Sequence, residues 1–406
     1  MAVATFPRID DRGCDEESAD TPVDVFRAAL LSMIAPTTGT EVLALADGIG
    51  RIIAADIRSP IALPGFDRAA MDGFGVGAGD LCEGKLLRIA TSSESLSEGT
   101  AVRLHTGGAI PRGVVAVVRR ERAAVQGEMA RLRESILPGA DIRRRGEDFR
   151  EGTTIARAGA AIDARLTALL AACGIAEVTV RRRVRVAVLS TGNELVGRDG
   201  AQPPVHDSNR PMLLALLAGP GVEMIDGGIV GDDAAAQADR LRDLTSRADL
   251  IVCTGGTAGS PADVLPDAIA RAGGTARACR LALRPGRPIL LGRIGRAVLL
   301  GLPGNPLAAF VTAQLFAGPA IVALAGGRRH HSPAGQPASL AEPRRDRPRI
   351  AAFVPCVVTA CDADGRPILR LLPSGSGRLL PLAESDGLAE LAPDGAVRFY
   401  RDGRIG

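Results

Sequence analysis

Three glycine-containing loops carry the residue types that proteins use to bind phosphate. They are STGNEL (190–195), TGGTAGSPAD (254–263) and GLPGNP (301–306), and each follows an apolar run typical of a buried strand. Glycines such as Gly255 and Gly256 let backbone N–H groups approach an anion, and a helix beginning after the loop adds its positive end. One such loop alone is more often a plain strand-to-helix turn. Three of them in one domain favour a phosphate-containing ligand, although neither a GxGxxG nor a P-loop pattern is present.

Three carboxylates lie in or beside these loops, namely Glu194, Asp232 and Asp263. Mg²⁺ usually binds through one or two carboxylates together with phosphate oxygens. The carboxylates therefore favour metal-assisted chemistry at a phosphate. Each is equally explained as a helix cap, and Asp263 most readily, because it precedes a predicted helix.

The segment RLALRPGRP (280–288) contributes Arg280, Arg284 and Arg287. Guanidinium groups bind oxyanions through two parallel hydrogen bonds, although a solvated basic loop explains these arginines equally well in so arginine-rich a chain. No Ser–His–Asp or Cys–His arrangement is apparent. The residue types alone thus predict a phosphorylated, nucleotide-like ligand bound together with Mg²⁺.

A further segment, LPGFDRAAMDGFGV (63–76), places Asp67 and Asp72 five residues apart in a glycine-punctuated loop. It is explained as a turn, as a metal site or as part of a catalytic pocket, and its residues alone do not decide between the three.

The composition argues against several functional classes. Of the 406 residues, 46% are hydrophobic and 2% aromatic, and the net charge is +3. Stacking on single-stranded nucleic acid needs aromatic side chains, and a nearly balanced charge gives no strong attraction to nucleic acid or membranes. The seven cysteines form no CxxC pair. We therefore expect reduced thiols and a cytoplasmic protein, and no secretion signal is visible.

The elements that must position these residues follow from apolar periodicity. It predicts a helix over 21–33, a β-rich region over 75–142 and a helix over 164–174 that returns the chain to its first region. From residue 183 onward strands and helices alternate, which predicts a parallel sheet covered by helices on both faces.

The most apolar run, 306–326, is long enough to span a membrane. Gln314 and the Gly318–Pro319 break favour a buried core helix instead. A linker rich in Pro, Gly and Arg, 325–348, then precedes a small C-terminal β-domain.

Taken as an ordered set, the motifs resemble the molybdopterin molybdenumtransferase family, the MoeA proteins, whose eukaryotic relative is the C-terminal part of gephyrin. The resemblance covers roughly residues 20–400 and rests on eight segments in the same order. They are LPGFDRAAMDGFGV, HTGGAIPRGVVAVVRRE, DIRRRGEDF, VRVAVLSTGNEL, HDSNRPML, TGGTAGSPAD, LRPGRP and GLPGNP.

The resemblance implies a multidomain α/β plus β fold. Its domains would be an N-terminal linking domain (1–60 with 149–182), an inserted β-rich domain (61–148), a MogA-like parallel α/β sandwich domain (183–327) and a barrel-like C-terminal β-domain (345–406). It also implies a homodimer whose active site is shared between subunits.

The implied activity is the transfer of molybdenum from molybdate to adenylylated molybdopterin, with Mg²⁺-dependent cleavage of the adenylate and release of AMP. The molybdopterin adenylyltransferase and molybdoenzyme delivery proteins are implied partners. Because the ligand's own dithiolene would bind molybdenum, the protein needs no cysteine or histidine site for that metal.

Residue roles carry over only where the motifs match. The resemblance implies reaction-centre roles for Asp72, Thr106, Asp148, Glu194 and Asp263. It implies Mg²⁺ binding by Asp72, Glu194, Asp232 and Asp263. Substrate binding is implied for Ser190, Thr191, Gly192, Thr254, Gly255, Gly256, Arg280, Arg284 and Pro306. Asp67, by contrast, is expected to be a structural turn residue.

The chain departs from the family pattern at several of these positions. Ala258 and Ser260 replace a serine and a glycine of the phosphate loop, and Arg280, Arg284 and Arg287 stand where lysines are expected. These departures motivate an alternative function, a non-catalytic protein of the same fold that binds and delivers molybdopterin or the finished cofactor. The full set of flanking domains argues against an adenylyltransferase, and a scaffold role is not expected because no partner-binding extension is visible.

Overall fold

The computed structural model describes residues 20–90, 96–195, 205–257, 263–327, 335–344, 346–375 and 377–401. The chain forms two compact units. The first comprises Met1–Ala55, Ala158–Ala164 and Glu177–Gly406, and the second comprises Asp56–Arg157 and Arg165–Ala176. Ala258 and Ser260 of the predicted phosphate loop lie outside the described residues.

A six-stranded sheet forms the centre of the first unit. In spatial order its strands are β14 (Val222–Val230), β13 (Val184–Thr191), β15 (Leu250–Thr254), β19 (Ala297–Leu302), β18 (Pro288–Ile294) and β16 (Thr275–Arg280). The first four run parallel, which confirms the predicted parallel sheet. The last two are antiparallel to their neighbours and were not predicted. Because only Gly295 and Arg296 join β18 to β19, the chain reverses in a hairpin and cannot make a parallel crossover.

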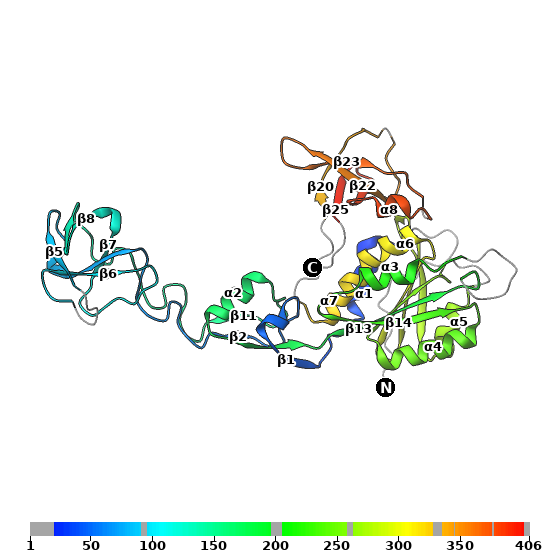
Figure 1. Cartoon of the computed structure of the whole chain (residues 1–406). Coiled ribbons are helices and arrows are strands. Elements are labelled where there is room, and N and C mark those ends of the chain that lie inside the picture. The colour runs from blue at the N-terminus through cyan, green and yellow to red at the C-terminus, as the bar shows by residue number, and fades with distance from the viewer. Residues whose placement is uncertain are drawn as a thin grey trace. The chain divides into compact units, whose positions relative to one another are not determined.

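Helices cover both faces of this sheet, as expected (Figure 1). On one face lie α1 (Val23–Ser32), α3 (Asn209–Leu216), α6 (Pro306–Thr312) and α7 (Gly318–Leu324). On the other lie α4 (Ala234–Arg247) and α5 (Leu265–Arg271). The side chains of β13 alternate accordingly, since Val186 and Val188 pack on the first face and Ala187 and Leu189 on the second.

The apolar run near the C-terminal side of this domain is a helix of the core. The helix Pro306–Leu324 has a mean hydropathy of 1.9 and the length of a membrane span, yet 89% of its most apolar window is buried inside the protein. Its middle, Ala313–Ala317, is a π-helical turn that joins α6 to α7. Phe316 of this turn packs edge-on against Phe26 of α1, with ring centroids 4.8 Å apart. The prediction of a buried core helix is therefore confirmed.

The N-terminal part of the first unit is held by a two-stranded sheet. There β1 (Thr40–Ala44), followed by a 3₁₀ turn at Leu45–Gly48, pairs antiparallel with β12 (Glu177–Arg181). Arg51 is only 2% exposed and crosses between these strands. Its Nη2 donates to Glu41 Oε2 at 2.9 Å and to the carbonyl of Arg181 at 2.8 Å.

The C-terminal region forms a seven-stranded, barrel-like sheet, in agreement with the predicted β-domain. Its strands are β17 (Leu283–Arg284), β20 (Gln336–Pro337), β21 (Ser339–Leu340), β22 (Ala351–Cys361), β23 (Pro367–Leu371), β24 (Gly387–Leu391) and β25 (Val397–Arg401), and it also carries α8 (Leu380–Ala383). The strands β20 and β21 lie inside the predicted linker. They are two-residue pieces, and β20 lies at the sheet edge, where a proline is tolerated.

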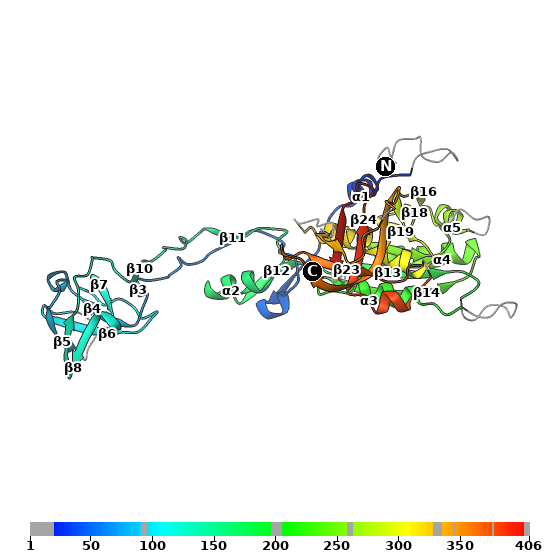
Figure 2. The same cartoon turned by 90° about the horizontal axis from the view of Figure 1, so that it is seen from above.

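The second unit is β-rich, as predicted for 75–142. Its six-stranded sheet consists, in spatial order, of β7 (Ala116–Arg119), β4 (Gly73–Val76), β6 (Thr100–Leu104), β5 (Leu86–Ala90), β9 (Met129–Leu132) and β8 (Ala123–Gln126). Strands β4 to β8 are labelled in Figure 2. Two short ladders pair β3 (Arg68–Ala69) with β10 (Ile142–Arg143) and β2 (Ile57–Arg58) with β11 (Thr154–Ala156). The remaining elements are the 3₁₀ turns Ala78–Asp80 and Arg120–Arg122 and the predicted helix α2 (Ala164–Ala172).

Candidate functional site

The strongest candidate site lies where the connections of the parallel sheet change direction. Strands β13 and β15 are adjacent and parallel. The chain leaving β13 reaches α3 on one face of the sheet, whereas the chain leaving β15 reaches α5 on the other. In open α/β sheets such a topological switch point leaves a crevice at the carboxyl ends of the strands, and ligands bind there.

The predicted substrate-binding residues of β13 and β15 meet at this point. Ser190 and Thr191 end β13, Thr254 ends β15, and all three are at most 3% exposed. The Thr191 hydroxyl donates to the carbonyl of Thr254 at 3.3 Å. Gly255 follows with φ +96°, and a Cβ there would lie 2.5 Å from the carbonyl oxygen of Thr191. Only glycine allows so close an approach of the two strand ends, which explains the Gly–Gly pair.

A third loop joins them through one side chain. Asn209, the first residue of α3, donates from Nδ2 to Thr254 Oγ1 at 2.8 Å and to the Gly304 carbonyl at 2.6 Å. Gly304 precedes Pro306, which begins α6 as predicted. The loops after β13, β15 and β19 are thus in mutual contact, as their shared edge of the sheet requires.

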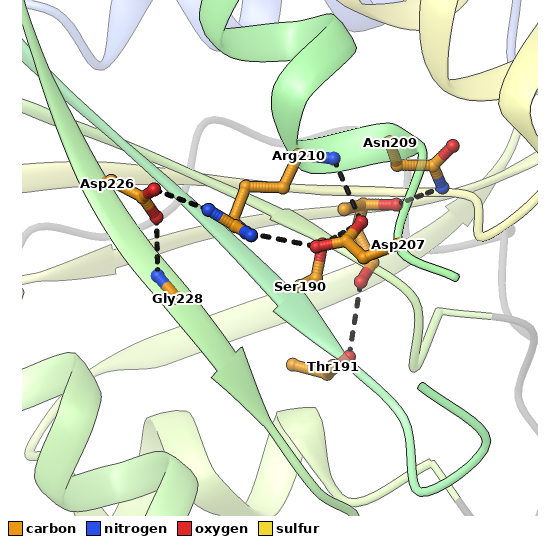
Figure 3. Close-up of polar contacts among 8 residues, drawn as sticks. Ser190, Thr191, Asp207, Asn209, Arg210, Asp226 and Gly228 are labelled. Atoms are coloured by element: carbon orange, nitrogen blue, oxygen red, sulfur yellow. Dashed lines mark hydrogen bonds and ion pairs between the residues drawn. The ribbon is translucent and has the colours of Figure 1, made fainter. Parts of the chain in front are cut away.

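An ion-paired network lies beside these loops (Figure 3). The Asp207 side chain is only 5% exposed and accepts hydrogen bonds from Ser190 Oγ at 3.0 Å, Arg210 Nε at 3.0 Å and Arg210 N at 3.1 Å. Arg210 also bonds to Asp226 on β14, which accepts the Gly228 N–H at 2.8 Å. Burial works to raise the pKa of Asp226, but the Gly228 N–H and Arg210 outweigh it, so the pKa of Asp226 is lowered.

Sequence reasoning did not assign roles to Asp207, Asn209, Arg210 or Asp226. The first three stand in the HDSNRPML segment (206–213), which carried the family resemblance without a chemical role. Ser208 is the N-cap residue of α3, but its side chain makes no capping bond, and the Asp207 carboxylate accepts the Arg210 N–H instead.

Two of the predicted metal ligands, Glu194 and Asp232, lie beside the switch point. Asp232 Oδ2 accepts from Asn193 N at 3.0 Å, while Asp232 N donates to Asn193 Oδ1 at 2.9 Å. This reciprocal pair binds the loop after β14 to the loop that carries Glu194. Asp233, not Asp232, caps α4, with its Oδ1 accepting the Ala236 N–H. The alternative that Asp232 is a helix cap is therefore wrong.

Glu194 itself is exposed and folds back over Gly192, where the Glu194 carboxylate occupies the space that a Cβ would need. Asp263 is half-buried and stands two residues before α5, whose N-cap residue is Val264. The alternative that Asp263 is the N-cap residue of α5 is therefore wrong by one position.

Two of the three arginines of RLALRPGRP, Arg280 and Arg287, lie at the carboxyl-end edge of the sheet. Strand β16 runs in the direction of β19, so its last residue, Arg280, is at the carboxyl-end edge. Arg287 Nη2 lies 2.5 Å from Asp20 Oδ2 and Arg280 Nε lies 3.6 Å from Asp20 Oδ1. Arg284 is exposed on β17. Two of the three are therefore ion-paired to Asp20, which neither the phosphate-binding nor the solvated-loop interpretation anticipated.

The donor set at the switch point fits Mg²⁺ as a phosphate-bridging ion. Within the described ranges no group of three His, Cys, Asp or Glu side chains could enclose a metal. Mg²⁺ does not require such a cage, because it keeps several waters and needs only one or two carboxylates beside phosphate oxygens. Glu194 and Asp232, held together through Asn193 at the switch point, offer the hard oxygen donors that this chemistry requires.

The other predicted reaction-centre residues belong to the second unit. Asp72 Oδ1 accepts from Thr106 N at 2.7 Å and from Thr106 Oγ1 at 2.8 Å. These two bonds, of which the backbone N–H bond has the larger effect, hold the pKa of Asp72 below its ordinary value. The carboxylate of Asp72 therefore stays ionised at neutral pH. Asp148 Oδ1 is 2.5 Å from Arg143 Nη2.

Asp67 binds the loop that contains Arg144 and Arg145. Its Oδ1 accepts from Arg145 N and its Oδ2 from Arg144 Nη1, both at 2.8 Å. The expected structural role of Asp67 is consistent with these bonds. Arg143 and Arg144 are both ion-paired within the second unit.

Comparison with known proteins adds independent information. Three family models match in order, "MoeA N-terminal region (domain I and II)" over residues 21–174, "Probable molybdopterin binding domain" over 187–323 and "MoeA C-terminal region (domain IV)" over 337–403.

Similar proteins cover most of the chain. A molybdopterin molybdenumtransferase of Haemophilus influenzae is 35% identical over 321 residues, covering 77% of this chain and 79% of the relative. Molybdopterin molybdenumtransferase 2 of Mycobacterium tuberculosis is 31% identical, covering 85% and 89%. A crystal structure of a molybdopterin biosynthesis MoeA protein from Pyrococcus horikoshii superposes with a TM-score of 0.71 at 26% identity, covering 95% of this chain and 97% of that one.

Proposed function

Since this chain belongs to the molybdopterin molybdenumtransferase (MoeA) family, and is a transferase of molybdenum cofactor biosynthesis, we propose that it transfers molybdenum from molybdate to adenylylated molybdopterin. Water adds across the phosphoanhydride bond of the ligand and AMP leaves. The ligand's two dithiolene sulfurs replace two oxygens of molybdate, which leave as water, so the oxidation state of molybdenum does not change. The observation that carries this proposal is the switch point. There Ser190, Thr191, Thr254 and the Gly255–Gly256 pair converge beside carboxylates.

Each group at the switch point has a chemical task in this proposal. The Gly255–Gly256 turn has positive φ at both residues, a conformation that glycine adopts readily, and it offers backbone N–H groups to the phosphate of the ligand. Ser190 and Thr191 border the same crevice from β13, and Asp207 holds the Ser190 hydroxyl in place. Pro306 begins the long core helix, so the positive end of that helix faces the edge where the phosphate would lie.

Glu194 and Asp232 are the residues that would hold Mg²⁺, and Asp72 and Asp263 are the further ligands we propose. When bound, Mg²⁺ supplies positive charge that stabilises the phosphate oxygens during loss of AMP. Arg280 and Arg284 contribute positive charge to the site, with Arg280 restrained by Asp20.

We further propose a cytoplasmic homodimer. In this dimer, Asp72, Thr106 and Asp148 of one subunit complete the switch-point site of its partner. We also propose that the chain has the four domains that the family resemblance implies. The proposal draws support from the division of the site residues between units, because Asp72, Thr106 and Asp148 belong to the second compact unit and the switch-point residues belong to the first. The molybdopterin adenylyltransferase, which supplies adenylylated ligand, and delivery proteins, which receive the product, are the expected protein partners.

The test is a reconstituted assay with the purified full-length chain, adenylylated molybdopterin, Mg²⁺ and molybdate. AMP release is followed by liquid chromatography and bound molybdenum by mass spectrometry. We expect AMP release that depends on both molybdate and Mg²⁺, and a loss of at least about a hundredfold in Glu194→Ala, as for a group that stabilises charge in the transition state.

Glu223→Ala is the matched control, because Glu223 is an exposed carboxylate near the opposite, amino end of β14. It should retain the wild-type rate. If the wild-type protein binds molybdopterin tightly and releases no AMP with molybdate, the transfer reaction is refuted and a binding-and-delivery function takes its place.

A further inference from the structure

Asn209 is the only described side chain whose amide joins the three loops of the switch point. It begins α3 after β13, it donates to Thr254 at the end of β15, and it donates to Gly304 in the loop between β19 and α6. The side chain is 8% exposed, so both bonds are shielded from competing water. Figure 3 shows the amide directed from α3 toward the strand end.

The orientation of this amide is determined by chemistry. A backbone carbonyl can only accept a hydrogen bond, so the atom that faces Gly304 O at 2.6 Å must be Nδ2. The oxygen is consequently directed elsewhere. Among the residues that the structure describes, Asn209 Oδ1 is buried and has no hydrogen-bond partner.

Helix capping does not explain this residue. Ser208 occupies the N-cap position of α3, and the Arg210 N–H of the first turn is already satisfied by Asp207. Packing alone does not explain it either, because a leucine of similar size would fill the space without leaving a buried acceptor unsatisfied.

We propose that Asn209 is a positioning residue for the molybdopterin site. Its two donated bonds set the spacing between the Thr254–Gly256 turn and the Gly304 loop, and its unpartnered Oδ1 accepts a hydrogen bond from an N–H or O–H group in the site when ligand is bound. This inference rests on the proposed function, because it assigns the spacing of the three loops to the binding of that ligand.

The first measurement needs no ligand. Asn209→Leu removes both bonds at nearly constant volume, and hydrogen exchange of the Gly255 amide, which donates to Leu302 O at 3.2 Å, reports the order of the turn. We expect exchange at Gly255 to become at least tenfold faster than in the wild-type protein. Leu213→Ala is the control, since Leu213 lies on the same helix, is fully buried and contacts the core.

Leu213→Ala should lower the melting temperature at least as much as Asn209→Leu does. It should leave the ratio of Gly255 exchange to exchange in the central strand β13 unchanged. If both variants change this ratio equally, Asn209 is an ordinary stabilising residue and the inference is wrong.

The second measurement separates hydrogen bonding from shape. In Asn209→Asp a carboxylate faces the Gly304 carbonyl, and burial together with that carbonyl raises its pKa. Protonated, the carboxyl group regains one O–H donor. Molybdopterin affinity, measured by equilibrium dialysis, should therefore fall about tenfold at pH 8. It should recover toward wild type at pH 5.5, whereas Asn209→Leu should not recover.

Other charged groups belong to the same network. They are Asp207 and Arg210 at the start of α3 and Asp226 on β14. Wild-type protein measured at each pH corrects for them. Equal affinity of all Asn209 variants would overturn the inference, whereas a wild-type protein that binds no molybdopterin would overturn the proposed function and leave the hydrogen-exchange result standing.

Discussion

At the scale of single residues, the close approach of two backbone segments restricts which residue types can stand at the strand ends. Gly255 illustrates this, because its φ of +96° and its contact with the Thr191 carbonyl both exclude a side chain. The sequence indicated a turn there. The structure adds that the turn is pressed against the end of the neighbouring strand, so its conformation and the position of Thr191 are linked.

We predict that Gly255→Ala disrupts the site more than its backbone conformation alone would cause. The positive φ costs about 1–2 kcal/mol for a residue with a Cβ. The 2.5 Å contact with Thr191 O adds about 1–3 kcal/mol, because the backbone must move to relieve it. Unfolding by urea and calorimetric titration with molybdopterin measure the two effects, and we expect ligand binding to be lost.

Gly273→Ala is the matched control, since Gly273 has φ +78° in the same domain and a Cβ added there would meet no atom within 4 Å. It should cost only the conformational term and leave molybdopterin binding intact. If the two variants lose equal stability, the contact with Thr191 carries no energetic weight.

At the scale of elements, a half-buried carboxylate joins the strands that carry the site. Asp249 stands just before β15 and accepts from Arg182 Nη1 and Nη2, both at 2.8 Å, and from Arg185 N at 2.9 Å. Burial works to raise the pKa of Asp249, but the hydrogen bonds of Arg182 and Arg185 outweigh it and lower the pKa. The carboxylate thereby aligns the amino ends of β13 and β15, whose carboxyl ends form the site.

This linkage predicts a pH-dependent contribution to stability. Because the pKa of Asp249 is lowered on folding, its contribution is complete above the ordinary carboxylate range and is lost as the pH falls through the folded-state pKa. Asp249→Asn should therefore reduce the free energy of unfolding by about 1–3 kcal/mol at pH 7, and the difference from wild type should shrink below about pH 4. Urea unfolding at pH 7 and pH 3 measures both values.

Asp239→Asn provides the comparison, because Asp239 is 78% exposed and pairs with Arg242 on the surface of α4. Its effect should stay below about 0.5 kcal/mol at both pH values. An Asp249→Asn penalty that is the same at pH 7 and pH 3 would show that geometry, and not ionisation, carries the contribution.

At the scale of the whole molecule, the proposed reaction needs residues that the chain places in two compact units. Asp72, with its bonds from Thr106, belongs to the second unit, and Glu194 belongs to the first. The proposed homodimer brings them together between subunits. Complementation between inactive subunits tests this arrangement directly.

We predict that Asp72→Ala and Glu194→Ala proteins, each inactive alone, regain activity when their subunits are mixed by co-expression. Half of randomly formed dimers contain one of each subunit, and one of their two sites is then intact, so about a quarter of the wild-type AMP release should return. Mixing Asp72→Ala with Asp148→Ala should restore nothing, because both substitutions lie in the second unit. Recovery in neither mixture, with mixed dimers demonstrated by mass spectrometry, would mean that each chain builds its own site.

Much of the fold followed from local patterns. Apolar runs such as 184–191 and 250–254 predicted buried parallel strands, and the loops after them predicted a ligand site at one edge, because strand direction and face alternation are local properties. The hairpin of β18 and β19 and the short strands β20 and β21 were not anticipated. Their pairing depends on neighbours supplied by tertiary packing, and two-residue strands have no periodicity to detect.

The sequence by itself determined the order of motifs, the family to which they belong, the glycines at the strand ends and the carboxylates beside them. Only the tertiary structure decided which groups those residues contact: Asp20 binds Arg280 and Arg287, Asp207 binds Ser190 and Arg210, and Asn209 bridges two loops. Asn209 and Gly304 are separated by 95 positions along the chain. A hydrogen bond depends on distances of a few tenths of an ångström, and close packing of the folded chain sets those distances, whereas spacing along the sequence does not.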